Sequence, residues 1–142
     1  MARQHISQAR RRLVAERARR CCEYCLLHED DRPDTHHVDH VIPIKHGGQT
    51  VSENLACACA ECNRFKGTDF ATLDRVSGEI VSLFNPRTQQ WREHFTLEGA
   101  QITALTVTGR VTVDVLRMNT AARLLERETL IALGRYPLSF VR

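Results

Sequence analysis

The sequence predicts a small domain of the α+β class, in which helical and strand-forming segments are separated along the chain. Three observations lead to this class: a helical pattern at residues 7–20, a strand, loop, strand and helix pattern at residues 36–67, and a second helical pattern at residues 120–133. With 142 residues the chain has the length of one domain. No run of 18 apolar residues occurs, so we expect no membrane span.

The N-terminal segment, residues 1–20, is predicted to be a basic helix. It begins after Ser7, whose hydroxyl can cap a helix, and Leu13, Val14 and Ala18 would form its narrow apolar stripe. The net charge of the chain is only +3, but seven arginines fall in this segment: Arg3, Arg10, Arg11, Arg12, Arg17, Arg19 and Arg20. Arginine suits bidentate phosphate contacts, and the alternative is a solvated helix face.

Residues 36–67 read as a hairpin followed by a helix. Val38 and Val41 favour extended backbone, and Pro43 with Gly47-Gly48 begins a loop. The predicted elements are a strand at 36–41, a turn at 52–54, a return strand at 55–58, and a helix from Cys59 or Ala60 to about Gly67.

The C-terminal half, residues 71–142, is predicted to be a mixed α/β extension packed on the preceding part. Strands are expected at 80–84, 91–97 and 101–107. Residues 110–117 alternate as a strand would, but Thr108 could also cap a helix there, and we favour the helix. A helix at 120–133 should turn Ala121, Leu124, Leu125 and Ile131 inward and stop at Gly134.

Two Cys-x-x-Cys pairs, Cys22 with Cys25 and Cys59 with Cys62, indicate a closed four-thiolate zinc site of the structural kind. Cys21 could compete as a ligand, but only Cys22 gives the Cys-x-x-Cys spacing. No apolar leader precedes the pairs, so we expect a cytoplasmic protein with reduced cysteines. Buried or redox-active thiols are the alternative. The gap between the two pairs is longer than in a simple zinc ribbon, and it contains Asp39-His40.

The motifs of residues 20–70 resemble those of the HNH endonucleases. The matching residues are Cys22-Glu23-Tyr24-Cys25, His37-Val38-Asp39-His40-Val41-Ile42-Pro43, Gly47-Gly48, Asn54-Leu55 and Cys59-Ala60-Glu61-Cys62-Asn63-Arg64-Phe65-Lys66-Gly67. The resemblance covers about a third of the chain, and Asn63 in place of a final histidine makes it an H-N-N variant. It implies a ββα-metal core with a four-cysteine zinc knuckle, here residues 21–70.

The resemblance and the residue chemistry together suggest roles for the motif. His40 is the predicted general base, because an imidazole can take a proton from water near neutral pH. Asp39 and Asn63 would hold a catalytic Mg²⁺ or Mn²⁺, which requires a twist or bulge because adjacent strand residues face opposite ways. The alternatives are an ion pair with an arginine for Asp39 and a helix cap for Asn63. By resemblance, Asn54 does no chemistry but fixes the strand that carries His40.

These expectations describe a metal-dependent endonuclease that cuts double-stranded DNA, leaving 5′-phosphate and 3′-hydroxyl ends if it follows the family. Arg64, Lys66, Lys45, Arg11 and Arg12 are the predicted nucleic-acid contacts, and a homodimer is one arrangement that would cut both strands. The alternative is a zinc-stabilised DNA-binding module without catalysis, driven by the arginines of the N-terminus.

Overall fold

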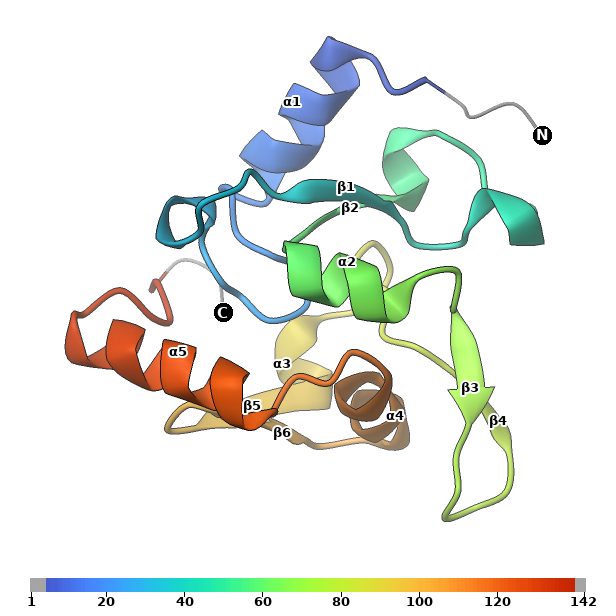
Figure 1. Ribbon diagram of the computed structural model, residues 1–142. Coiled ribbons are helices and arrows are strands. Elements are labelled where there is room, and N and C mark those ends of the chain that lie inside the picture. Colours follow the sequence, from blue (N-terminus) through green and yellow to red (C-terminus); the bar gives the residue numbers. More distant parts are fainter. Residues whose placement is uncertain (1–4, 140–142) are drawn as a thin grey trace.

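The computed structural model describes residues 5–139. Helix α1 (Gln8–Arg17), the antiparallel hairpin of β1 (His37–His40) and β2 (Leu55–Ala58), and helix α2 (Ala60–Lys66) form one half of the molecule (Figure 1). The hairpin lies between the two helices, since α1 packs on β2 and α2 packs on β1. This arrangement has the strand, strand and helix order expected from the sequence.

Helix α1 begins where the sequence indicates and ends earlier than predicted. The Ser7 hydroxyl accepts a hydrogen bond from the Arg10 amide at 3.1 Å, which satisfies one of the unpaired donors of the first turn. The helix ends at Arg17 and not near Arg20. Val14 is buried against Leu55 and Cys57 of β2, whereas Leu13, predicted to share the apolar stripe, is 46% exposed. The stripe is therefore narrower than expected.

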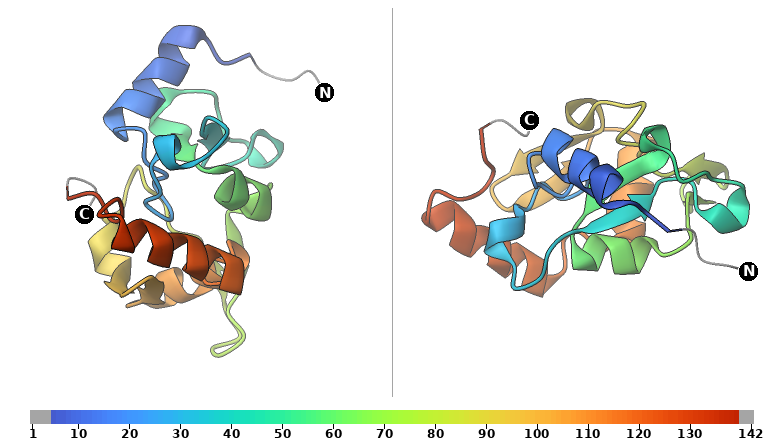
Figure 2. Two further views of the ribbon diagram at one scale, coloured as in Figure 1. Left: turned by 60° about the vertical axis from the view of Figure 1, so that its left-hand side comes forward. Right: turned by 90° about the horizontal axis from the view of Figure 1, so that it is seen from above.

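The second half contains two further hairpins and three helices. Strands β3 (Ala71–Leu73) and β4 (Ile80–Ser82) form a hairpin that projects from the body, as Figures 1 and 2 show. Strands β5 (Phe95–Glu98) and β6 (Gln101–Ala104) pair below α2, beside helices α3 (Trp91–His94), α4 (Val107–Val115) and α5 (Ala121–Ala132). The α+β class is thus confirmed, with small two-stranded sheets.

Three predictions for this half need correction. Residues 91–94 are a short helix and not the start of a strand, and within it the Trp91 indole N–H donates to the Tyr24 carbonyl at 2.8 Å. Residues 107–115 are helical as favoured, but Thr106 and not Thr108 is the cap. Strand β3 was not anticipated. Residues 1–4 and 140–142 of the predicted N-terminal and C-terminal parts lie outside the described residues.

The inward face of α5 also differs from the prediction. Ala121, Leu125 and Ile131 are exposed, while Arg123 and Arg127 are buried. Arg127 fills the space between α5 and β6, donating to the Ala100 carbonyl and the Met118 carbonyl, both at 2.7 Å. Hydrogen-bonded arginines therefore occupy positions where an apolar pattern would place leucines.

One continuous apolar core joins the two halves. It contains residues of the cysteine-rich segment, of β2 and of the C-terminal half, among them Tyr24, Phe84, Phe95, Leu116 and Met118. Tyr136 reaches back from beyond α5 to donate its hydroxyl to the Cys25 carbonyl at 2.7 Å. In the described part of the chain, no helix is both long and apolar enough to cross a membrane.

Candidate functional site

Four cysteine sulfurs meet at the centre of the molecule. The Sγ atoms of Cys22, Cys25, Cys59 and Cys62 all lie within 4.8 Å of one another and are buried. In a tetrahedral zinc site with Zn–S bonds of about 2.3 Å, the sulfurs are separated by about 3.8 Å, and the Cys25 and Cys59 sulfurs are 3.6 Å apart. The cluster therefore fits zinc, with no ligand position left open. Cys21 lies outside it, which resolves the choice between Cys21 and Cys22.

Local backbone geometry brings these sulfurs together. A bridge between Cys21 and His28 closes a tight loop, in which Leu26 has a positive φ of 70° and donates its amide to the Cys22 carbonyl. On the other side, Cys59 is the N-cap of α2, and its sulfur accepts from the Cys62 amide at 3.5 Å. Each Cys-x-x-Cys pair thus turns both sulfurs toward the same point.

Asp39 is almost fully buried and has two partners. Its carboxylate accepts from the Tyr24 hydroxyl at 2.8 Å and from the Lys66 ammonium at 3.2 Å. Burial raises the pKa of the carboxyl, and Lys66 and Tyr24 oppose that rise. A twist or a bulge was expected beside Asp39, and strands β1 and β2 pair residue by residue through His40, so a bulge is absent. The alternative interpretation of Asp39 was an ion pair with an arginine. Asp39 does form an ion pair, but its partner is Lys66.

His40 lies at the end of β1, half-buried, and its Nε2 is 2.9 Å from the Thr50 hydroxyl. Partial burial lowers the pKa of the imidazole, nearby Asp39 opposes this, and Lys66 reinforces it. The lowered pKa favours the neutral ring, in which one nitrogen keeps its lone pair.

Asn54 ties together the two ends of the loop that follows His40. Its Oδ1 accepts from the Ile42 amide, and its Nδ2 donates to the carbonyls of Ile42 and Gln49, each at 2.9 Å. Gly48 makes this packing possible, because a Cβ at that position would lie 1.7 Å from the Ile42 carbonyl oxygen. The asparagine thereby fixes the backbone just after His40.

Asn63 is a half-buried residue inside α2 and not its cap, since Cys59 has that position. Within residues 5–139, its side-chain amide makes no hydrogen bond. The alternative interpretation of Asn63 as a helix cap is thereby removed. An unpaired amide oxygen on the helix that also carries Lys66 is a suitable ligand for a hard cation.

Comparison with protein families identifies the segment that contains this site. Residues 22–69 match the model of a family described as HNH endonuclease. This segment is an HNH domain. No match was found among curated proteins or among solved structures. The HNH domain includes both Cys-x-x-Cys pairs, Asp39, His40, Asn54 and Asn63, so the proposed site and the family match coincide.

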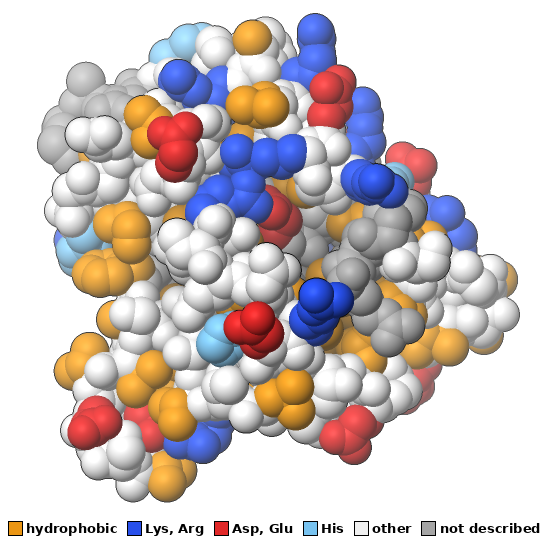
Figure 3. Space-filling view, turned by 180° about the vertical axis from the view of Figure 1, so that it is seen from behind, with side chains coloured by type: hydrophobic (Ala, Val, Ile, Leu, Met, Phe, Trp, Pro, Cys, Tyr) orange, Lys and Arg blue, Asp and Glu red, His pale blue; other side chains and the backbone are white. Residues whose placement is uncertain are grey.

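Most of the basic residues predicted to contact DNA are at the surface of the molecule. Arg11 and Arg12 of α1, Lys45 of the loop after β1, and Arg64 of α2 are exposed. The Arg64 guanidinium lies 4.7 Å from the centre of the Phe65 ring, a cation–π contact that leaves its outer edge to solvent. On the face shown in Figure 3, Lys and Arg side chains are more numerous in the upper half, at the height of α1.

Lys66 requires a correction. Its side chain is only 1% exposed, and its ammonium donates to Asp39 Oδ1, to the His40 carbonyl at 3.0 Å and to the Val41 carbonyl at 3.1 Å. A phosphate cannot approach an ammonium that is enclosed in this way, so the predicted DNA contact is replaced by a structural role. The sequence signal for that role is weak, since buried lysines are rare.

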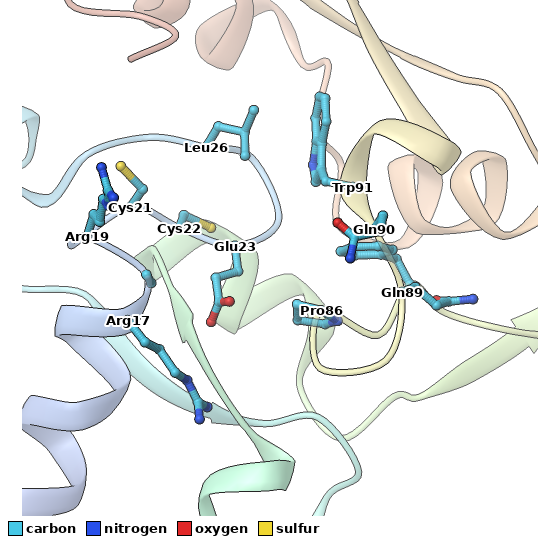
Figure 4. Close-up of a pocket in the computed structure, with 12 residues that line it drawn as sticks. Arg17, Arg19, Cys21, Cys22, Glu23, Leu26, Pro86, Gln89, Gln90 and Trp91 are labelled. Carbon is cyan, nitrogen blue, oxygen red and sulfur yellow. The ribbon is translucent and has the colours of Figure 1, made fainter. Parts of the chain in front are cut away.

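Two grooves flank the HNH domain on the side of α1. One, of about 330 Å³, lies between α1 and β1 and is lined by Arg11, Arg12, His36 and His37 among others. The other, of about 220 Å³, lies between the segment of Cys21, Cys22 and Glu23 and the loop before α3 (Figure 4). Glu23 lies on one side of this second groove and Trp91 on the other. Neither groove contains Asp39, His40 or Asn63.

The structural roles of three residues of the site were not predicted from the sequence. Tyr24 and Lys66 bracket the Asp39 carboxylate, and Arg123 of α5 donates to the Cys62 sulfur at 3.1 Å. Tyr24 and Lys66 lie within the motif, so their positions were visible although their partners were not. Arg123 is 61 residues from Cys62, and no local pattern links the two.

Proposed function

We propose that this chain is a metal-dependent endonuclease that hydrolyses phosphodiester bonds of double-stranded DNA. The single observation that carries the proposal is the coincidence of the HNH match with a half-buried histidine at the end of β1, directly before a loop that Asn54 holds by hydrogen bonds. We place the activity in the cytoplasm, where reduced thiols can hold zinc.

His40 is the proposed general base. We assign the tautomer in which Nε2–H donates to the Thr50 hydroxyl, which leaves the Nδ1 lone pair to take a proton from water. The lowered pKa keeps this lone pair available at neutral pH. Asn54 acts as a positioning residue, because its three hydrogen bonds hold the backbone that follows His40.

Asp39 and Asn63 are the proposed ligands of a catalytic Mg²⁺ or Mn²⁺. Such an ion, when bound, would polarise the phosphate and stabilise the departing 3′ oxygen. The Lys66 ammonium lies among three oxygen atoms beside His40, which marks a position where the fold stabilises positive charge. We therefore propose that Asp39 exchanges its contact with Lys66 for one with the divalent ion.

The exposed arginines would hold the DNA backbone. Arg11 and Arg12 flank the groove between α1 and β1, while Lys45 lies in the loop after β1 and Arg64 lies on α2. These four cations would neutralise phosphates and release counterions on binding. The proposal includes a homodimer as one way to cut both strands.

A second candidate is a zinc-stabilised DNA-binding module without catalysis. The observation that favours it is the buried ion pair of Asp39 with Lys66, which fills the proposed ligand position with an ammonium. A pure binding module has no need for a neutral histidine beside that pair.

One experiment separates the two candidates. Purified protein is incubated with supercoiled plasmid and Mg²⁺ or Mn²⁺, with and without EDTA, and the DNA ends are mapped. The nuclease proposal expects metal-dependent nicks or breaks with 5′-phosphate ends. Retarded but intact plasmid under every metal condition would favour the binding module.

A further inference from the structure

Arg123 is a buried cation that lacks a carboxylate partner in the described part of the chain. Its side chain is 6% exposed. One terminal nitrogen donates to the Leu116 and Arg117 carbonyls, at 2.8 and 3.4 Å, and the other lies 3.1 Å from the Cys62 sulfur and 3.8 Å from the Cys59 sulfur. Lys66 and Arg32 are paired with acids, and the buried Arg127 donates to carbonyl and amide oxygens. Arg123 differs from these three cations because it contacts cysteine sulfurs.

Among the partners of Arg123, the cysteine sulfurs are the groups that can carry a negative charge. A buried guanidinium beside thiolates gains a counter-charge that neutral thiols would not supply, which offsets part of its desolvation cost. Four thiolates around one Zn²⁺ carry a net charge of −2, since four negative charges outweigh two positive ones. A guanidinium beside them halves that buried charge, and its N–H groups are good donors to thiolate sulfur.

We propose that Arg123 is a positioning residue of the zinc–thiolate centre, which holds the sulfurs of Cys59 and Cys62 on the metal and slows its loss. Hydrogen bonds to metal ligands fix their orientation, and removing such partners commonly costs about 10–100-fold in metal affinity.

The coupling must be reciprocal. If Arg123 stabilises the zinc centre, zinc binding stabilises the docking of α5 by the same free energy. Helix α5 belongs to the C-terminal half, so this contact links that half to the metal of the HNH domain. The inference depends on zinc binding alone and not on the proposed nuclease activity.

Arg127 supplies a matched control one helical turn away. It is also buried on α5, and its partners are the carbonyls of Ala100 and Met118 and the Asn119 side chain, with no sulfur among them. Replacing Arg127 with methionine perturbs the same helix to a similar extent but leaves the thiolates untouched. Differences between the two variants therefore report on the sulfur contact.

The test compares full-length wild type, Arg123→Met, Arg123→Lys and Arg127→Met, all loaded with zinc. Zinc release to an excess of chelator is followed by a metal-sensitive dye. We expect release about 10–100-fold faster in Arg123→Met and within about twofold of wild type in Arg127→Met. Arg123→Lys keeps the charge with a single donor group, so it should lie between wild type and Arg123→Met.

A spectroscopic measurement distinguishes a thiolate contact from general loosening of the fold. In cobalt-substituted protein, the thiolate-to-cobalt charge-transfer band should move to lower energy in Arg123→Met, because the sulfur lone pairs lose a hydrogen-bond donor. Arg127→Met should keep the wild-type band. Equal release rates and identical bands in Arg123→Met and Arg127→Met would overturn the proposal. If Arg123→Met does not fold, Arg123→Lys decides: a wild-type rate and band there would overturn it equally.

Discussion

Removal of the Lys66 ammonium is the perturbation that tests the interior of the site most sharply. Lys66 is 1% exposed and Asp39 is 4% exposed, so neither charge is solvated by bulk water. In Lys66→Met the carboxylate would keep the Tyr24 hydroxyl but lose its counter-charge, and two backbone carbonyls would lose a donor. Breaking a buried ion pair on one side typically costs about 3–5 kcal/mol, and we expect that loss here.

The loss should depend on pH in a defined direction. Burial already raises the pKa of Asp39, and removing Lys66 raises it further. A carboxyl whose pKa is higher in the folded than in the unfolded state binds protons on folding, so stability is gained as pH falls. The deficit of Lys66→Met should therefore be largest near pH 8 and shrink toward pH 5.

The assay is urea unfolding of zinc-loaded protein at pH 8 and pH 5.5. The chain contains only one other lysine, Lys45, which is exposed. Lys45→Met is thus the matched control, and comparison at each pH cancels any shared effect of acid on the zinc site. The double variant Asp39→Asn with Lys66→Met should lose less unfolding free energy than the two single variants lose in sum, by at least about 1 kcal/mol. Equal stability of Lys66→Met and Lys45→Met would refute the ion-pair argument.

Further predictions concern the base, the zinc and the DNA contacts. Cleavage should change little from about pH 8 to pH 6.5 and should fall at lower pH as His40 becomes protonated, because the lowered pKa of His40 keeps its ring neutral down to pH values below the ordinary pKa of about 6.5. A loss of cleavage centred above pH 7 would contradict this prediction. Cys62→Ser should lose zinc, and with it most of the roughly 10–16 kcal/mol that such a site contributes to folding, which thermal unfolding would measure. Cys21→Ser is the control and should retain zinc. Arg11→Gln with Arg12→Gln should weaken DNA binding equally for all sequences and reduce its salt dependence, and an unchanged salt slope would exclude these contacts.

The strand, strand and helix of the HNH domain could be predicted because its signals are local. Pro43 and Gly47-Gly48 mark the end of one strand, and the Cys-x-x-Cys spacing fixes the start of α2. The zinc cluster followed from the same spacing, which is independent of the rest of the fold. The family resemblance added the proposed roles of His40, Asn54 and Asn63.

Which side chains are buried in the C-terminal half could not be predicted, because polar contacts between residues far apart in the sequence determine their burial. Arg123 and Arg127 are buried on α5 since sulfurs and carbonyls receive their N–H groups, while Leu125 and Ile131 remain exposed. The apolar pattern of α5 would place leucine and isoleucine side chains in the core and the arginines in solvent. Likewise, alternation of large side chains suggested a strand from Trp91, but the indole N–H finds its acceptor on Tyr24 through a helical turn.

Substitution of His40 tests the central claim most directly. Single-turnover cleavage of a labelled duplex by wild type and His40→Ala is measured with Mn²⁺, together with zinc content and DNA affinity. The account predicts that His40→Ala keeps both zinc and DNA binding and loses about 10²–10⁴-fold in cleavage rate, the range that general acid–base catalysis contributes. Cleavage by His40→Ala at the wild-type rate would contradict the assignment of the base and, with it, the proposed mechanism.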